Sequence, residues 1–213
     1  MNQLFIINMA HREDRKQHML NELKIQQITQ FEFFVGMKLN TSDLNRWNPN
    51  YCEHVRRDIH PAKFLNYRLG ALGCLQSHLN IYRLALERGY ESIMILEDDT
   101  TFTGNMDVFE SYIKQLNGEY DMIYLAGSHL SKPQLVQDNL FKVIKTYTTG
   151  SYCIRKKAMQ YIVDNIQSYS KEIDVFLAEE VQPKFQCYVI QPHLTRQRDG
   201  YSDIQQGNVK YKI

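Results

Sequence analysis

Three consecutive carboxylates follow an apolar run near the middle of the chain, in Ile93-Met-Ile-Leu-Glu97-Asp98-Asp99. A buried strand cannot continue through adjacent unpaired charges, because each would lose its hydration without compensation. The strand must therefore present them at an edge or cleft, where ligands bind in open α/β sheets. Oxygen ligands suit Mg²⁺ or Mn²⁺, and alternate residues of an extended chain point the same way. The pattern predicts that Glu97 and Asp99 share one such cation while Asp98 points away; the alternative is a solvated acidic turn.

A second segment, Arg68-Leu-Gly70-Ala-Leu-Gly73-Cys-Leu-Gln-Ser77-His78, is predicted to open a helix. Glycines at a helix start let backbone N–H groups approach an anion, and the helix dipole favours negative charge there. A phosphate site at this helix start is therefore one interpretation of the segment. Glycines at helix starts also serve as packing devices, and His78 shares a helical face with Cys74, which is typical of a hydrogen-bonded core histidine.

A third segment follows the apolar run at the N-terminal end, where Asn8 precedes His11-Arg-Glu-Asp-Arg15. Guanidinium groups match the geometry of phosphate oxygens. Arg12 and Arg15, with Asn8 at the strand end, are therefore candidates to meet a nucleotide diphosphate. The alternative is an exposed first helical turn with internal ion pairs.

These candidate groups need strands and helices that bring them together. Apolar runs and helical stripes alternate along the first half of the chain, which predicts an α/β fold with a mainly parallel central sheet flanked by helices. A single domain over residues 1–213 is expected. The expected strands are 4–7, 31–35, 92–96, 122–125 and 187–190; the expected helices are 16–23, 69–89, 106–116 and 156–166; a hairpin is expected across 140–154, and an irregular surface excursion across 40–62.

Composition narrows the class of protein. The 213 residues carry a net charge of +1 and are 43% hydrophobic, which excludes disorder and gives no basic field for nucleic acid. The sequence has no apolar stretch near the ~18 residues of a membrane helix and no secretion signal. Four cysteines stand far apart, at 52, 74, 153 and 187, and the last three are expected to be buried thiols. A reducing, cytoplasmic setting in a bacterial or viral source is expected, and the oligomeric state is not predicted.

Four blocks of sequence resemble glycosyltransferase family 25, which includes bacterial lipopolysaccharide β-galactosyltransferases and collagen hydroxylysine galactosyltransferases. The blocks are Phe5–Arg15, Gly70–His78, Ile95–Asp99 and Gln197–Ile204. The spacing of G-x-x-G-C-x-x-S-H before L-E-D-D is the most specific part of this likeness.

The resemblance implies a GT-A-like fold, a UDP-hexose donor and a divalent metal, Mn²⁺ or Mg²⁺. It also implies inversion at the sugar carbon and an acceptor hydroxyl on a glycan, a lipid-linked sugar or hydroxylysine. Glu97–Asp99 stands where the family has its D-x-D-like motif, with Glu97 in place of the first Asp. Asn8, Arg12, Arg15, Ser77 and Asp98 would then lie near the nucleotide.

Inverting transfer needs a general base for the acceptor hydroxyl. Asp174 is the candidate because it begins an apolar helical segment, with Glu179 and Glu180 as rivals and a helix N-cap as its alternative role. Asp203 or His193 could complete the metal site from the C-terminal segment, for which the alternative is a disordered terminus.

Two other functions compete with glycosyl transfer. A metal-dependent phosphoesterase or nuclease also uses clustered carboxylates, but it would need more His and Asp ligands in tight spacing. A catalytically silent module could keep the fold to bind a carbohydrate or a protein, and the 14 tyrosines and Trp47 would suit sugar stacking.

Overall fold

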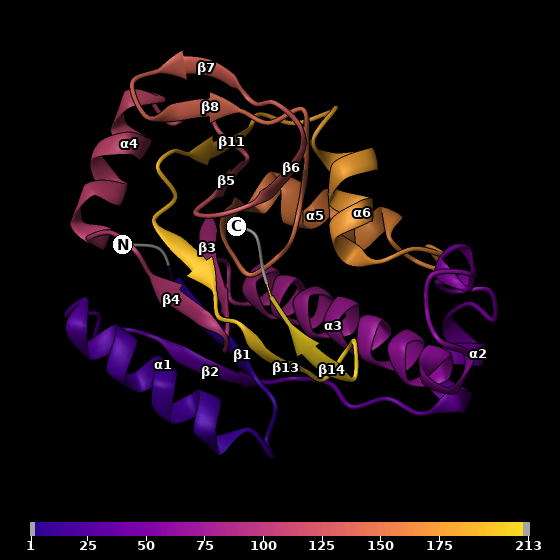
Figure 1. Ribbon diagram of the computed structural model, residues 1–213. Helices are drawn as coiled ribbons and strands as arrows, with labels where there is room; N and C mark the ends of the chain where they lie inside the picture. The colour runs from indigo at the N-terminus through magenta and orange to yellow at the C-terminus, as the bar shows by residue number, and fades with distance from the viewer. Residues whose placement is uncertain (1–2, 211–213) are drawn as a thin grey trace.

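The computed structural model describes residues 3–210, which form an eight-stranded sheet between two layers of helices (Figure 1). The strand order is β2-β1-β3-β10-β5-β11-β8-β7. The bounds are β1 Gln3–Asn8, β2 Glu32–Val35, β3 Ser92–Glu97, β5 Met122–Tyr124, β7 Gln134–Gln137, β8 Leu140–Lys142, β10 Ser151–Arg155 and β11 Cys187–Ile190.

Most strands of this sheet share one direction. β1 pairs in parallel with β2 and β3, and β11 pairs in parallel with β5. β10 is antiparallel to both β3 and β5, and β8 is antiparallel to both β11 and β7. Only β10 and β8 therefore oppose the other strands of this sheet, so the expected α/β fold with a mainly parallel sheet is confirmed.

Alternating side chains of the strands feed two cores. Ile93 and Ile95 of β3 pack on one face of the sheet, whereas Met94 and Leu96 pack on the other. The first face is covered by α3 Pro61–Glu87, α5 Lys156–Asn165, α6 Ile173–Phe176 and the π-helical turn η3 Leu177–Val181; the second is covered by α1 Glu13–Ile25, the 3-10 turn η2 Met106–Val108 and α4 Phe109–Gln115.

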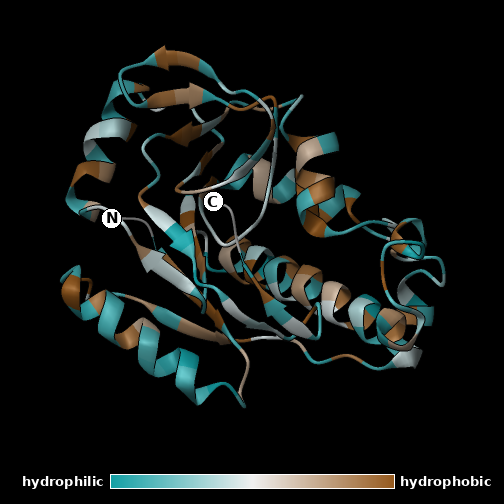
Figure 2. Ribbon diagram, in the orientation of Figure 1, coloured by the Kyte–Doolittle hydropathy of each residue, from teal (hydrophilic) through white to brown (hydrophobic). Residues whose placement is uncertain are grey.

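The colours of Figure 2 follow this burial, because the central strands are largely brown and α1 is largely teal towards solvent. Within residues 3–210, no helix has both the length and the apolar character needed to cross a bilayer.

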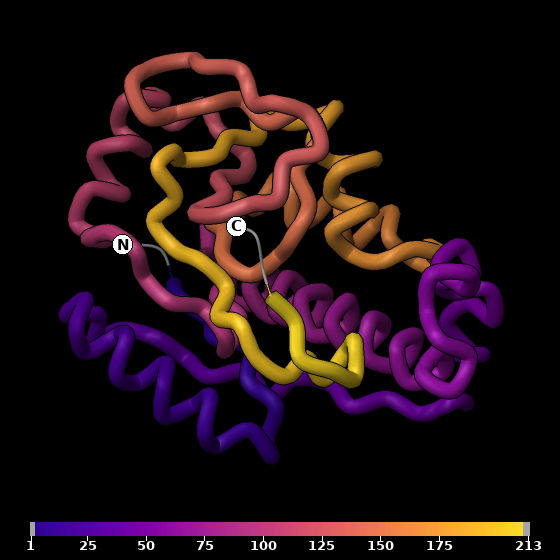
Figure 3. The backbone as a smooth tube through the Cα atoms, viewed as in Figure 1, coloured from indigo at the N-terminus to yellow at the C-terminus, as the bar shows by residue number. Residues whose placement is uncertain are grey.

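Three two-stranded ribbons complete the structure. β4 Thr100–Phe102 pairs with β12 Thr195–Gln197, β13 Gly200–Ser202 pairs with β14 Gly207–Val209, and β6 Ser128–Ser131 pairs with β9 Lys145–Tyr147. Figure 3 shows the chain after β11 running back past the sheet to lie against α3. The alternative of a disordered C-terminal segment is thus wrong for residues 195–209.

The hairpin expected across 140–154 does not form. Strands do occur there, but β8 pairs with β11 and β7, β9 pairs with β6, and β10 enters the sheet between β3 and β5. Long-range pairing overrides the short connections between these strands.

The excursion expected at 40–62 is also more ordered than predicted. It contains α2 Thr41–Trp47 and the 3-10 turn η1 Glu53–Val55. Asn40 and Asp43 form a capping box at the start of α2, each side chain bonded to the other's backbone. Trp47 and Tyr51 are buried in the core, so this segment packs on the molecule and is no loose loop.

Candidate functional site

A cavity of about 420 Å³ lies where β1 and β3 end beside α3. Two groups of residues face each other across it. The sheet wall consists of Cys74, Ser77, His78, Glu97, Asp98 and Asp99; the ribbon wall consists of Ser202, Asp203, Ile204 and Gln206. The three carboxylates thus lie in a cleft beyond a strand end, and the alternative of a solvated acidic turn is wrong.

Asp98 is held by residues from the first strand and helix. Its Oδ2 accepts a 2.8 Å hydrogen bond from Asn8 Nδ2, and its Oδ1 accepts one of 2.7 Å from Arg15. The parallel pairing of β1 and β3 brings Asn8 to this position, and α1 then carries Arg15 over the carboxylates. Asn8 and Arg15 therefore act on the cavity chiefly through Asp98 and its neighbour.

Asp99 carries negative charge that its surroundings only partly offset. Its Oδ2 accepts a 3.2 Å hydrogen bond from Arg15, and its Oδ1 accepts a long 3.5 Å bond from Gln197. Burial, with the negative charges of Glu97 and Asp98, raises the pKa of Asp99 to about 7 despite the opposing charge of Arg15. One guanidinium thus pairs with both Asp98 and Asp99, and a hard divalent cation would fit the remaining charge.

Glu97 faces α3. Its Oε1 accepts a 2.7 Å hydrogen bond from Thr149 Oγ1 and lies 3.2 Å from His78 Nε2. Burial opposes ionisation, but the bond and charge of His78 and the Thr149 hydroxyl hold the pKa of Glu97 below its usual range. The strand ends at Glu97, and the turn that follows puts Asp98 and Asp99 together on Arg15. Glu97 and Asp99 line the same cavity, and their sharing of one cation stays a prediction.

The glycine-rich segment lies within α3 and does not begin it. The helix starts at Pro61, capped by the His60 side chain, so the backbone N–H groups near Gly70 and Gly73 are far from its free N-terminus. A Cβ on Gly73 would stand 2.5 Å from the Met37 carbonyl oxygen. The packing alternative therefore holds, and the expected phosphate site at a helix start is wrong.

Ser77 helps to fix that packing. Its Oγ accepts a 2.8 Å hydrogen bond from the Met37 backbone N–H and donates a 2.7 Å bond to the Gly73 carbonyl. The side chain is 1% exposed. Ser77 therefore holds the chain after β2 against α3, and its hydroxyl is already engaged.

Arg12 joins the N-terminal segment to the ribbon wall. It donates a 2.7 Å bond to Asp203 Oδ2 and two 3.0 Å bonds to Asp14, and His11 lies 3.5 Å from the other oxygen of Asp203. Arg15 adds a 2.7 Å bond to the Tyr201 carbonyl. The ion pair with Asp14 agrees with the alternative of an exposed turn, while Asp203 gives Arg12 a second partner that the sequence did not indicate.

A second cavity, of about 520 Å³, adjoins the first. The two share the side chains of Cys74, Glu97, Ser202 and Ile204 as a partition. The second cavity is lined further by Tyr67, Thr148, Thr149, Glu172, Asp174, Glu179 and Gln197, among others.

Asp174 lies in this second cavity. It accepts hydrogen bonds from the backbone N–H groups of Thr148, at 3.2 Å, and Val175, at 2.9 Å. Burial and the charges of Glu172 and Glu97 raise the pKa of Asp174 to about 6, although both N–H groups lower it. Glu172 occupies the cap of α6, so the N-cap alternative for Asp174 is wrong.

The rival bases and His193 have other partners, although Glu179 lines the second cavity together with Asp174. Glu179 pairs with Lys171 at 2.8 Å and accepts from Tyr169, which lowers its pKa, and Glu180 pairs with Lys184 on the surface. His193 meets the ring of His129 edge to face, outside both cavities. Burial lowers the pKa of His193 to about 4.

Sequence reasoning missed Thr149 and Gln197, which reach the carboxylates from distant parts of the chain. It also treated Cys74 only as a core thiol, yet Cys74 and His78 stand four residues apart on α3 and both line the cavity. That i, i+4 spacing was the signal available.

Comparisons of the sequence with known proteins identify a family and several relatives. The family model described as glycosyltransferase family 25 (LPS biosynthesis protein) matches residues 1–177. Procollagen galactosyltransferase 2 of Mus musculus is 28% identical over 177 residues, covering 76% of this chain and 27% of that protein. The procollagen lysyl hydroxylase and glycosyltransferase of Acanthamoeba polyphaga mimivirus is 24% identical over 226 residues, covering 90% of this chain and 24% of its own length. The chain thus spans about a quarter of these curated relatives.

Two solved structures share the fold at low sequence identity. A197 from STIV gives a TM-score of 0.53 with 12% identity over 98% of this chain and 93% of that one. A glycosyltransferase involved in glycosylation of the major capsid of PBCV-1 gives 0.50 with 12% identity over 97% of each chain. The expected GT-A-like fold is confirmed, and the ribbon wall lies beyond the 177 residues that the family model matches.

Proposed function

The chain belongs to glycosyltransferase family 25, and on that premise we propose that it transfers a hexose, galactose or glucose, from a UDP-sugar to an acceptor hydroxyl with inversion. The observation that carries this proposal is the pair of adjoining cavities, one bordered by Asp98 and Asp99 and the other by Asp174. The first would take the donor and the second the acceptor, so that the reacting atoms meet at their partition.

Asp99 is the residue that we assign to the metal. Mn²⁺ or Mg²⁺ bound there would stabilise negative charge on the departing diphosphate. Two observations support this assignment. The Oδ1 atom of Asp99 accepts a long hydrogen bond, and the positive charge of Arg15 does not balance the negative charges of the neighbouring carboxylates. Asp203 faces the same cavity from the ribbon wall and is the proposed second ligand. Glu97 is held by His78 and Thr149, so the diphosphate cation is assigned away from it.

Three residues from the N-terminal segment, Asn8, Arg12 and Arg15, position these carboxylates. Asn8 and Arg15 fix Asp98, and Arg15 also orients Asp99. Arg12 orients Asp203. Arg15 lines the cavity and would place its guanidinium near the donor phosphates.

Asp174 is the proposed general base. Its carboxylate would accept the proton of the acceptor hydroxyl while that oxygen bonds to the anomeric carbon. The bond from that carbon to the diphosphate oxygen breaks in the same step, and UDP leaves with the electron pair. A pKa raised to about 6 suits a base that is ionised at neutral pH yet accepts a proton readily.

The proposed class of acceptor is based on the names of the relatives. Procollagen galactosyltransferases act, by their names, on procollagen, and a hydroxylysine acceptor is one candidate beside a glycan or a lipid-linked sugar. A silent binding module is the second candidate function, because one human relative, 28% identical over 135 residues, is named inactive glycosyltransferase 25 family member 3.

A panel of UDP- and GDP-sugars, assayed for released nucleotide with and without Mn²⁺, tests the proposal. We expect release from a UDP-hexose that Mn²⁺ enhances. Calorimetry with UDP and Mn²⁺ separates the second candidate, since a silent carbohydrate-binding module need not bind UDP. Absence of both turnover and UDP binding would remove the proposed function.

A further inference from the structure

The partition between the two cavities holds a cluster that the transfer chemistry does not use. We propose that Cys74, His78 and Glu97 bind a soft divalent cation, Zn²⁺, with a fourth coordination position open to the cavities. This site is separate from the hard cation assigned to Asp99, and it depends only on the three side chains themselves.

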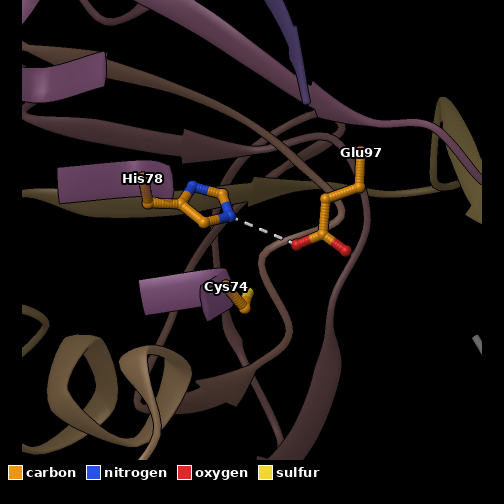
Figure 4. A group of neighbouring side chains, drawn as sticks. All are labelled: Cys74, His78 and Glu97. Carbon is orange, nitrogen blue, oxygen red and sulfur yellow. Dashed lines mark hydrogen bonds and ion pairs between the residues drawn. The ribbon is translucent and has the colours of Figure 1, made fainter. Parts of the chain in front are cut away.

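The three side chains converge from two elements (Figure 4). Cys74 and His78 stand one turn apart on the same face of α3, and Glu97 is the last residue of β3. One potential ligand atom from each lies within 4.8 Å of the others, and His78 Nε2 is 3.2 Å from Glu97 Oε1. Two atoms that share a tetrahedral Zn²⁺ at about 2.0–2.3 Å stand about 3.3–3.8 Å apart, so the His78–Glu97 pair already fits and the longest separation would have to close by roughly 1 Å.

Groups behind the ligands hold them in orientation, as in known metal sites. His78 Nδ1 lies 2.7 Å from the Tyr152 hydroxyl, and the two rings stack. Tyr152 in turn bonds to Tyr82, which fixes the hydroxyl between the two partners. This leaves Nε2 as the nitrogen aimed at the cluster. Thr149 plays the same part for Glu97 through its 2.7 Å bond.

The ligand types select the cation. A thiolate and an imidazole favour Zn²⁺ over Mg²⁺ or Mn²⁺, which prefer oxygen. Three protein ligands leave one tetrahedral position for water or a substrate atom, which is the pattern of reactive and not of purely structural zinc. Cys74 and Glu97 line both cavities, so that position faces the space where they meet.

A plain ion pair between His78 and Glu97 is the competing explanation, and metal titration separates the two. The full chain, stripped with a chelator, is titrated with Co²⁺, which takes zinc sites and absorbs characteristically when bound to thiolate. We expect a thiolate charge-transfer band that reports one Co²⁺ at this site, whatever Co²⁺ the Asp99 site takes up in addition, and Zn²⁺ should remove the band. Cys74→Ser should abolish the band, whereas Cys187→Ser, which changes a thiol buried in the core away from both cavities, should keep it.

Two further variants keep the test decisive. Thr149→Val leaves the three ligands in place but removes the support of Glu97, and it should weaken Co²⁺ affinity by about 10–100-fold. Asp99→Asn should retain the band even though it disrupts the proposed diphosphate cation. No band in the wild-type chain, or an undiminished band in folded Cys74→Ser, overturns the zinc site. Sugar transfer is measured separately, so a failed Co²⁺ titration leaves the proposed function standing, and absent transfer leaves the zinc site standing.

Discussion

The two walls of the first cavity are built in opposite ways. The sheet wall rests on β3 and α3, and its Ser77, His78, Asp98 and Asp99 are all less than a tenth exposed. The ribbon wall rests on β13 and β14, and the Asp203 side chain is 35% exposed. The sheet wall is fixed by buried hydrogen bonds, whereas the ribbon wall is tied on largely by charged contacts such as Arg12 to Asp203.

This difference separates two properties of the site. Buried, preorganised groups control charge at the reacting centre, since they need no rearrangement during the reaction. Partly exposed ion pairs are each worth little and are screened by salt. Changes in the sheet wall should therefore alter the rate, and changes in the ribbon wall should alter substrate affinity.

Replacing Asp99 by Ala tests the sheet wall and should have the largest effect. Loss of the metal-binding carboxylate should lower nucleotide release on the order of 10³-fold, from several kcal/mol of lost charge stabilisation. Thermal stability should stay nearly unchanged, because the variant removes a charge that its neighbours repel. Steady-state kinetics and a melting curve check both parts, and full activity in this variant would contradict the metal assignment.

Asp174 belongs to neither wall, and the effect of replacing it should lie between the effects of changes in the sheet wall and in the ribbon wall. Asp174→Asn should lower turnover by about 10²-fold, the usual contribution of a general base, with UDP affinity unchanged. Glu180→Gln is the matched control, because Glu180 pairs with Lys184 on the surface. Wild-type turnover in Asp174→Asn would place the base elsewhere.

The dependence of kcat/KM on pH is a second test of Asp174 as the general base. A base must be ionised to accept a proton, and the pKa of Asp174 is raised to about 6 by burial and by the facing charges of Glu172 and Glu97. Below that pH we expect kcat/KM to fall about tenfold per pH unit, and above it to level off. With saturating Mn²⁺, which would keep Asp99 ionised, the acidic limb should be missing from the residual activity of Asp174→Asn and should persist in Glu180→Gln.

The ribbon wall should give the smallest effect. Arg12→Ala breaks the 2.7 Å pair with Asp203 and should raise KM for the donor by about three- to tenfold, with kcat little changed. The wild-type KM should also rise with salt. Arg46→Ala is the control, since Arg46 is 79% exposed and outside both cavities. A loss in kcat as large as that of Asp99→Ala would end the distinction between the walls.

The parts of the fold that local patterns specify were predictable. A buried strand followed by carboxylates can only end at a cleft, so β3 and its acidic residues were placed correctly. The start of α3 was placed too late because its glycines were taken as a terminus, although Pro61 gave a start signal. The strands of 140–154 were found but paired wrongly, because their partners are distant in sequence.

Contacts between distant parts of the sequence were also hard to predict in the candidate site. Asn8 and Arg15 were expected near the carboxylates, and neighbouring strands brought them there. The contact of Arg12 with Asp203 joins residues 191 positions apart, and no local pattern predicts it. The bonds of Thr149 to Glu97 and Gln197 to Asp99 depend likewise on tertiary packing.

The position of the ribbon in the chain has a consequence for biosynthesis. Every strand of the eight-stranded sheet is translated by Ile190, whereas β14 ends at Val209. At about 5–20 residues per second, a ribosome needs roughly one to four seconds to add that interval. The second side of the cavity is thus synthesised only after every strand of the sheet, and nucleotide capture requires the segment that follows Ile190.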